Sequence, residues 1–361
     1  MNVCFITDPL VTTVGAVRPA LLLAKQFNKT RHNVTLVTSR SSEKIGQSLQ
    51  AEDIHVKEVG PTFSFVRSFP TFDAWARGLI RHNLATEICD SDIVINTSSS
   101  IMVRAHAYYA QGPMTRTLDG IFPDMPLHYK YTYRLLKSSL KILERGLVEK
   151  TRRLSRLFIA NSEFCASMYK EWGVKVDAVV NPPLDCSFFK PVTSNPTADY
   201  VLTCSGIHEK EGRMSIIKKV ADAGIKIKVF GDFSSAPRSL TRHSNIDFFG
   251  IVSGKELVHL YSNALYTLFA FNHEPFGYIP AESMACGTPV LTFNRQGPAE
   301  IVTDFQTGWL VETDEELVKT AKSIWEEGVD RKLRDACRKK ALGYDVKTIS
   351  KKWIAILERA K

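Results

Sequence analysis

The feature that most constrains the fold of this chain is a pattern of short apolar runs that alternate with helical stretches. The pattern is interrupted and then starts again at residue 200. The runs are continuous or nearly so and do not alternate strictly between apolar and polar residues, which is typical of strands buried on both faces of a parallel sheet. We therefore expect an α/β fold with two doubly wound parallel sheets. The expected strands are residues 3–7, 33–38, 54–59, 92–96, 104–110, 157–160 and 178–181, then 200–204, 225–230, 246–249, 266–271, 289–293 and 309–311.

Helical patterns fill several of the intervals between these strands. Two helix starts carry a capping box, because Ser253 is followed by Glu256 and Thr313 by Glu316, three residues on in each case. Helices are expected at residues 16–27, 73–88, 129–155, 163–172 and 346–360.

Residues 191–199 separate the two halves and are rich in Pro, Ser and Thr, as interdomain linkers are. A chain of 361 residues is also long enough for two domains. The expected organisation is two Rossmann-like domains that face each other across a cleft, with a boundary between residues 190 and 191. In such sheets ligands bind beyond the carboxyl ends of the strands, so functional residues should directly follow the expected strands.

Several classes of protein are excluded by what the sequence lacks. The seven cysteines are scattered without a C-x-x-C pair, which favours reduced, buried thiols over a disulfide framework or a zinc site. The run of about 18 apolar residues that a transmembrane helix needs is missing, and the first residues resemble a strand and not a signal peptide. These features predict a cytoplasmic protein.

The net charge is +9, and most of it lies in residues 129–156, which contain nine Lys and Arg and two Glu. Two interpretations of this segment remain open. It is a long surface helix with its leucines on the core, or it is an interfacial helix that touches anionic lipid and attaches the protein peripherally to the inner face of a membrane. A nucleic-acid partner is not expected, because no recognised binding motif accompanies the charge.

The densest group of chemically useful residues lies at 271–287. Glu274 follows an expected strand, and Glu282 lies about one turn inside a helix expected to begin near Tyr278. Amides at a helix start form a phosphate site, and Gly277 lets a ligand approach the backbone closely. The amides in question belong to Phe276, Gly277, Tyr278 and Ile279.

The two carboxylates beside this helix start narrow the choice of ligand. Carboxylates are unsuited to phosphate, but they accept hydrogen bonds from the hydroxyl groups of a sugar and of a ribose. The residues by themselves therefore indicate a nucleotide-sugar site. The alternative is a capped helix that carries two surface glutamates.

The segment and its continuation to Val302 closely resemble the signature of family 4 glycosyltransferases, which are retaining enzymes of the GT-B fold. Two glutamates eight residues apart, an E-x-F-G core, M-A-C-G-x-P-V and G-P-A-E-I-V occur in the family's order and spacing. The resemblance implies an acceptor-side domain at 1–190 and a nucleotide-sugar domain at 191–344. It also implies a C-terminal helix at 345–361 that returns to the first domain.

The resemblance assigns roles to the two glutamates of this segment. Glu274 would take the catalytic position at hydroxyls of the donor sugar, helped by the amides of Phe276 and Gly277. Glu282 would bind the ribose hydroxyls.

The remaining donor-binding residues follow from the same resemblance. The amides of Tyr278 and Ile279 would hold the diphosphate. Gly231 resembles the glycine turn near the nucleobase pocket, and Ile251 lies in the loop that cradles the base.

Two departures from the family pattern concern positions that approach phosphate. Ile207 stands where an arginine that neutralises the diphosphate is usual, so Lys210 or Arg213 would supply the charge in the loop that begins at Gly206. We prefer Lys210 for this catalytic role. Only Gly15 remains of the usual two glycines after the first strand, where it would let a phosphate approach the next helix.

A third departure concerns the residue that follows a middle strand of the first domain. Gln111 aligns with a histidine that the family often carries close to the transferred sugar. A Gln donates a hydrogen bond but takes no proton. In retaining enzymes of this family the departing phosphate can take the acceptor's proton. The substitution should therefore lower the rate of transfer more than it alters the mechanism.

The resemblance implies a retaining glycosyltransferase that moves a hexose from a UDP- or GDP-sugar to a hydroxyl of a glycan or lipid-linked acceptor. The contrasting interpretation, motivated by Ile207 and Gln111, is a catalytically silent GT-B subunit that binds a nucleotide-sugar or a partner. No cofactor and no obligatory metal are expected, since the nucleotide-sugar is itself a substrate.

Overall fold

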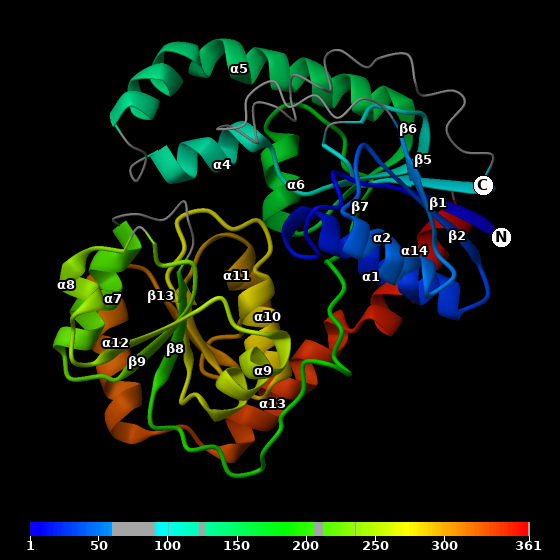
Figure 1. Ribbon diagram of the computed structural model, residues 1–361. Coiled ribbons are helices and arrows are strands. Elements are labelled where there is room, and N and C mark those ends of the chain that lie inside the picture. The colour runs from blue at the N-terminus through cyan, green and yellow to red at the C-terminus, as the bar shows by residue number, and fades with distance from the viewer. Residues whose placement is uncertain (60–90, 100, 123–126, 206–211, 235, 360–361) are drawn as a thin grey trace. The chain divides into compact units, whose positions relative to one another are not determined.

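The computed structural model describes residues 1–59, 91–99, 101–122, 127–205, 212–234 and 236–359 (Figure 1). The helix expected at 73–88 therefore lies outside the described residues. The chain divides into two compact units. Unit 1 consists of Met1–Met114, Ser139–Pro183 and Val346–Lys361, and unit 2 of Thr115–Ser138 and Leu184–Asp345.

The described part of unit 1 contains a seven-stranded sheet in the order β3-β2-β1-β4-β5-β6-β7, with neighbouring strands parallel. Each strand overlaps a run that the sequence predicts. The strands are β1 (Asn2–Ile6), β2 (Asn33–Thr38), β3 (His55–Glu58), β4 (Ile93–Asn96), β5 (Ala105–Ala110), β6 (Ser155–Ala160) and β7 (Ala178–Val179).

Amphipathic helices bury the apolar side chains of this sheet. α1 (Arg18–Lys29) places Ala20, Leu23, Ala24 and Phe27 in the core, at the spacing of one helix face. From the other end of the chain, α14 (Val346–Glu358) brings Trp353 into the same core, 5.2 Å between ring centroids from Tyr109 of β5. Two further described helices, α2 (Glu43–Gln50) and α6 (Glu163–Lys170), also lie within unit 1.

The described part of unit 2 contains a six-stranded parallel sheet in the order β10-β9-β8-β11-β12-β13. These strands also overlap the predicted runs. They are β8 (Val201–Ser205), β9 (Ile227–Gly231), β10 (Ile246–Gly250), β11 (Thr267–Phe269), β12 (Val290–Phe293) and β13 (Gly308–Val311).

Helices cover both faces of the unit 2 sheet, and each face has its own apolar cluster (Figure 1). On one face lie α7 (Gly212–Asp222), α8 (Arg238–Thr241) and α12 (Asp314–Glu327). On the other lie α9 (Gly254–Asn263), α10 (Tyr278–Ala285), α11 (Gln296–Ile301) and α13 (Arg331–Ala341).

The two predicted helix caps differ in detail. Ser253 and Glu256 form the complete capping box at α9. At α12 the Thr313 hydroxyl accepts from Glu316 N–H, but the Glu316 carboxylate accepts from the Glu312 amide, one residue before the N-cap. The second prediction is therefore half right.

The units differ from the predicted division at 1–190, 191–344 and 345–361. Residues 184–190 belong to unit 2, where Leu184 N–H donates to Tyr344 O (2.8 Å). Residues 115–138 also group with unit 2. They comprise nearly all of α4 (Met114–Ile121) and the first part of α5 (Leu127–Leu154), so α5 contributes to both units.

The cysteines follow the prediction in part. Five of them are free and buried, namely Cys165, Cys186, Cys204, Cys286 and Cys337. Cys4 is instead disulfide-bonded, contrary to the expectation of reduced thiols. No described helix combines the length and the apolar character that a membrane span requires.

Candidate active site

The start of α10 lies at the carboxyl edge of the unit 2 sheet, directly after the loop that follows β11. The helix begins at Tyr278, as predicted, and its N-cap is Gly277. The φ of Gly277 is 107°, a left-handed conformation that favours glycine, and a Cβ there would come within 3.3 Å of Pro280 and Pro298. Among the described residues no side chain caps this helix, so the positive end of its dipole suits an anion.

Glu274 lies in the loop before α10 and is half-buried. Its Oε1 accepts a hydrogen bond from the Phe276 amide (3.3 Å), and its own amide donates to Gln296 Oε1 (2.8 Å). The Phe276 amide, expected to assist Glu274 at the sugar, therefore orients the Glu274 carboxylate itself.

Two residues that sequence reasoning missed hold this loop in place. Gln296 Nε2 donates to Asn272 O (2.7 Å), and Gly297 N–H donates to Glu274 O (3.1 Å). A Cβ at Gly297 would lie 2.3 Å from Pro275 O, so only glycine fits. The signal that could have revealed it was the G-P-A-E-I-V motif, whose first residue is Gly297.

Glu282 is almost fully buried on α10, with 5% of its surface exposed. Its Oε2 accepts a hydrogen bond from the hydroxyl of Tyr261 on α9 (3.0 Å). Burial, and then the nearby Glu282 carboxylate, raise the pKa of Tyr261, so its hydroxyl stays protonated and donates. One carboxylate oxygen of Glu282 is thus fixed by a neighbour that no sequence motif indicated.

His273 precedes Glu274 and packs against α4. A Cβ added to Gly120 of α4 would be 2.4 Å from the His273 Cβ. Burial, and then the Arg116 charge, lower the pKa of His273 to about 4, while Asp119 acts in the opposite direction. The imidazole is therefore neutral at neutral pH. The packing of α4 against His273 was not predicted from the sequence.

The predicted nucleobase residues lie beyond β9 and β10. Gly231 ends β9 with a φ of 102°, and a Cβ there would be 2.2 Å from Ser205 O, so the close approach of β8 requires glycine. Ile251 is 88% exposed and Phe233 is 37% exposed. This edge therefore presents apolar surface, which suits a flat base.

Three predicted residues fall in or beside a stretch that is not described. Gly206 and Lys210 lie outside the described residues. Arg213 lies in the first turn of α7, where only the backbone is described.

The two predicted residues of unit 1 meet at the carboxyl edge of its own sheet. Gly15 opens a 3-10 turn before α1 with a φ of 70°. Gln111 follows β5, and its Nε2 donates to the carbonyl of Ala16 (2.8 Å). Gln111 thus holds the turn that begins at Gly15.

Other polar side chains at this edge also hold the surrounding loops. The Asp8 carboxylate accepts from Ser98 Oγ (2.6 Å) and from the Ser99 amide (3.1 Å). Asn96 Nδ2 donates to Ile101 O (2.8 Å). Across the described ranges, no group of three or more His, Cys, Asp or Glu side chains is arranged to hold a metal ion.

Two family models match this chain, one in each half. The model described as Glycosyltransferase Family 4 matches residues 14–187, and the model described as Glycosyl transferases group 1 matches residues 233–343. The second match contains the α10 site with Glu274 and Glu282.

Curated relatives match shorter stretches. A probable sucrose-phosphate synthase from Thermosipho melanesiensis is 31% identical over 116 residues, which are 31% of this chain and 27% of that protein. The α-1,3/1,6-mannosyltransferase ALG2 of Eremothecium gossypii is 31% identical over 113 residues, 28% of this chain and 21% of that protein. The matches therefore span about a quarter of the relatives' own length.

A solved structure matches along nearly the whole chain. HepE from Anabaena, in complex with UDP, aligns with a TM-score of 0.70 at 16% identity, covering 99% of this chain and 100% of that chain. At this identity the likeness concerns the fold. Two parallel-sheet units, the matches to both family models and this likeness lead to one conclusion: the chain has the GT-B fold and belongs to family 4 of the glycosyltransferases.

Proposed function

We propose that this protein is a retaining glycosyltransferase that moves a hexose from a UDP- or GDP-sugar to a hydroxyl of a glycan or lipid-linked acceptor. The observation that carries the proposal is the arrangement at the start of α10, with Glu274 before the helix, Gly277 at its N-cap and Glu282 inside it. The UDP complex of HepE and the mannosyltransferase name of ALG2 support this donor class.

In this proposal the donor lies along the helix start. The amides of Tyr278 and Ile279 and the helix dipole bind the diphosphate, and Gly277 lets it approach. The Glu282 carboxylate accepts hydrogen bonds from the ribose, and the Glu274 carboxylate accepts them from the sugar hydroxyls. A hydrogen bond to a charged group of this kind contributes ~1.5–3 kcal/mol.

The transfer breaks the bond between the anomeric carbon and the diphosphate oxygen, and forms a bond from that carbon to the acceptor oxygen on the same face. The departing diphosphate oxygen takes the acceptor's proton, so no side chain has to act as the base. Gln111 donates a hydrogen bond near the transferred sugar, and Lys210 neutralises charge that develops on the leaving diphosphate. No obligatory metal forms part of this proposal.

The ribose assignment is tested by the variant Glu282→Ala. Loss of a charged acceptor should weaken the binding of UDP or GDP roughly tenfold to a hundredfold. The affinities are measured by calorimetry, with Glu326→Ala as the control, because Glu326 is exposed on α12 and pairs only with Lys322 among the contacts seen. If the affinity for both nucleotides is unchanged, the ribose assignment is wrong.

A measurement of turnover distinguishes an enzyme from a catalytically silent subunit. A panel of UDP-, GDP- and ADP-hexoses is incubated with the protein, and slow hydrolysis of each donor is followed. Hydrolysis of one donor supports the enzyme. Binding of a donor without any turnover, with or without a glycan acceptor, supports the silent subunit.

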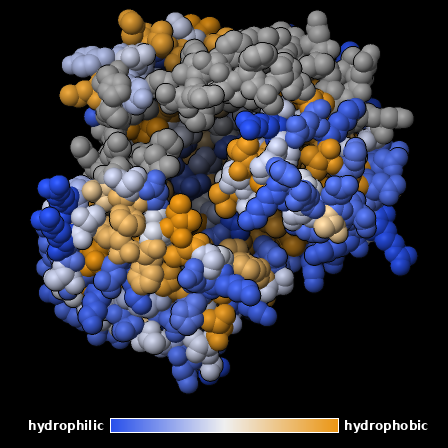
Figure 2. Space-filling model, in the orientation of Figure 1, coloured by the Kyte–Doolittle hydropathy of each residue, from blue (hydrophilic) through white to orange (hydrophobic). Residues whose placement is uncertain are grey.

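A specific observation favours the lipid-surface interpretation of α5. Leu127, Tyr131, Leu135 and Ile142 are 71%, 71%, 83% and 75% exposed, and their spacing puts them on one side of the helix. The buried Tyr133 and Glu144 face the opposite side. In Figure 2 apolar side chains reach the surface at the end where α5 begins.

We propose that this stripe, with Arg134 and Arg145 beside it, attaches the protein peripherally to an anionic membrane. Each basic residue close to such a surface contributes ~1 kcal/mol, which suits reversible attachment. The protein should float with phosphatidylglycerol vesicles at low salt, and Leu135→Glu should reduce the floated fraction. Val192→Glu, at an exposed site of unit 2, is the control. An unchanged floated fraction for Leu135→Glu contradicts the proposal.

A further inference from the structure

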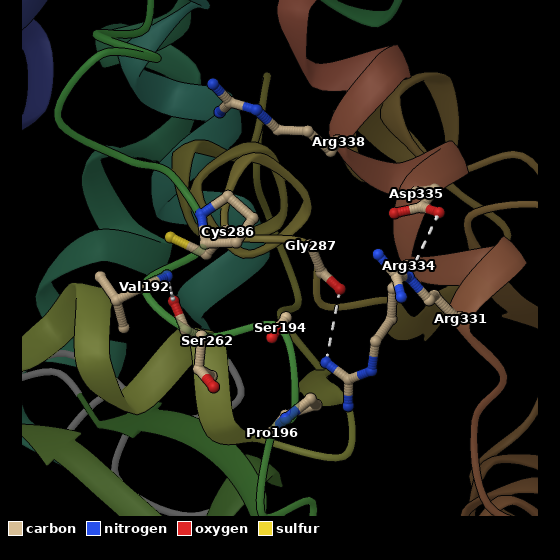
Figure 3. Close-up of a pocket in the computed structure, with 12 residues that line it drawn as sticks. Val192, Ser194, Pro196, Ser262, Cys286, Gly287, Arg331, Arg334, Asp335 and Arg338 are labelled. Carbon is tan, nitrogen blue, oxygen red and sulfur yellow. Dashed lines mark hydrogen bonds and ion pairs between the residues drawn. The ribbon is translucent and has the colours of Figure 1, made fainter.

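A cavity of about 410 Å³ lies behind the carboxyl end of α10, away from the helix start that carries the candidate site (Figure 3). Residues 191–196 and the carboxyl ends of α9 and α10 form part of its wall. Arg331, Arg334 and Arg338 of α13 form the rest, one turn apart on one side of that helix. Sequence analysis did not predict α13 and assigned no role to these arginines.

The guanidinium of Arg338 joins α10 to a segment far away in the sequence. Its Nη1 donates to Ala285 O (2.8 Å), in the last turn of α10, and to Phe189 O (2.7 Å). Its Nη2 donates to Cys186 O (2.9 Å). One side chain therefore satisfies three backbone carbonyls.

The guanidinium of Arg334 joins the ends of α9 and α10. Its Nη2 donates to Ala264 O (2.8 Å), the C-cap of α9. Its Nη1 donates to Gly287 O (3.4 Å) and to Thr288 Oγ1 (3.2 Å), just beyond α10, and the first of these bonds is drawn in Figure 3. Burial lowers the pKa of this guanidinium, because removal from water disfavours its charged form, and the carbonyl acceptors replace the lost water contacts.

These contacts give Arg334 and Arg338 a role that needs no anion in the cavity. The last carbonyls of a helix lack intrahelical donors and carry the negative end of its dipole, so a cation there is stabilised by the protein itself. Arg334 and Arg338 are used in this way. The third cation, Arg331, has an 80% exposed side chain and lies 3.9 Å from the Asp335 carboxylate.

The helix ends that the two arginines contact lie about one turn from Glu282 and from its partner Tyr261. Ala285 lies three residues after Glu282 on α10, which is one helical turn. Tyr261, which donates to Glu282, lies three residues before Ala264 on α9. The Thr288 hydroxyl also donates to Tyr261 O (2.6 Å), so Arg334 is linked to the backbone of Tyr261 through Thr288.

We propose that Arg338 and Arg334 are positioning residues for the donor site: they fix the carboxyl ends of α10 and α9, and thereby hold Glu282 at the ribose. This inference rests on the proposed function, because it assigns the ribose to Glu282. It adds that the preference for a ribonucleotide over its 2′-deoxy form depends on two arginines at the opposite end of α10.

The test compares a ribonucleotide with its 2′-deoxy form. The affinities of UDP and 2′-deoxy-UDP, and of GDP and 2′-deoxy-GDP, are measured by calorimetry well below the melting temperature of each variant. Wild-type protein should prefer the ribonucleotide about tenfold, the size of one hydrogen bond to a charged group. Arg338→Ala should reduce the preference below about threefold, whereas the control Arg331→Ala, on the same wall of the cavity, should retain it.

A purely structural role would lower the melting temperature and leave the ratio of affinities unchanged, and that result for Arg338→Ala overturns the proposal. If Arg338→Ala does not fold, Arg338→Lys gives the answer. Lysine keeps the stem and the charge, but one ammonium does not span three carbonyls, so the preference should fall to an intermediate value, and a full wild-type preference overturns the proposal. A wild-type protein that binds nucleotides without ribose preference contradicts the role of Glu282 and the inference with it.

Discussion

The carboxyl edges of the two sheets use their residues in different ways. At the unit 2 edge, Gly277 and Gly297 are required by backbone conformation or by packing, and Glu282 is buried beside a helix start. At the unit 1 edge, the side chains of Asp8 and Gln111 form hydrogen bonds that join neighbouring loops of the protein. A site built from backbone amides and steric fit tolerates few sequences, so it leaves a specific motif, whereas loops held by side chains can be built in many ways.

The largest effect should come from Gly297→Ala, which tests whether steric fit governs the unit 2 edge. The new Cβ would overlap Pro275 O, 2.3 Å away, and would displace the loop that carries Glu274. A displacement of about 1 Å can cost a hundredfold in rate, so donor hydrolysis should fall at least about that much. Gly343→Ala is the control, since its Cβ meets no atom within 4 Å. Equal activities of Gly297→Ala and Gly343→Ala would show that steric fit at Gly297 does not govern the unit 2 edge.

A pH titration of stability tests how tightly the loop at the unit 2 edge is packed. The pKa of His273 is lowered to about 4 in the folded protein, from an ordinary value of 6.5. Between these values the unfolded chain binds more protons, so the free energy of unfolding should fall as the pH falls through this window, and should level off below pH 4. The loss should amount to about 2–3 kcal/mol.

The contribution of His273 is isolated by substitution. Urea unfolding of His273→Asn should lack this part of the pH dependence between pH 6.5 and pH 4.5. The control His55→Asn, at an exposed position of β3, should keep the wild-type slope. If His273→Asn shows the same slope as wild type, the loop is not packed as described.

A smaller effect is expected at the unit 1 edge from Gln111→Ala. The variant loses one neutral hydrogen bond to Ala16 O and, under the proposed function, one donor to the transferred sugar, so kcat should fall about tenfold. The KM for the donor should stay within about twofold, because donor binding is assigned to unit 2. A large rise in the donor KM would show that the edge of unit 1 also binds the nucleotide. The two sheet edges would then not differ in this respect.

The smallest effect should come from Asp8→Asn. Replacing the carboxylate weakens the bonds from Ser98 Oγ and the Ser99 amide, so the free energy of unfolding should fall by ~1 kcal/mol. Nucleotide affinity, measured by calorimetry, should not change. A loss of affinity would mean that Asp8 serves a ligand and not the loop at Ser98 and Ser99.

The strands were predictable because buried parallel strands leave continuous apolar runs, as in 33–38, which matches β2 in full. The start of α10 was also predictable, since Gly277 and Pro280 mark it in sequence. Contacts between distant segments were not. Nothing local relates Gly120 to His273, or Tyr261 to Glu282, because each pair meets only when separate helices pack.

The boundaries of the two units could not be predicted from the sequence either, for a physical reason. Residues 191–199 have the composition of a linker, yet 191–196 line the cavity beside α13, and the division falls at Pro183. Composition reports local chain stiffness, while the division between units follows from which contacts are formed.

The sequence by itself determined the fold class, the family signature and the position of the two glutamates around a helix start. These depend on local periodicity, on backbone conformation at glycine and on the order of motifs along the chain. Only the tertiary structure decided which partners orient those glutamates, with Phe276 and Gln296 at the loop of Glu274, and Tyr261 at Glu282. It also decided that Arg334 and Arg338 close the ends of two helices, because a buried hydrogen bond depends on distance in space, which the spacing of residues along a chain does not specify.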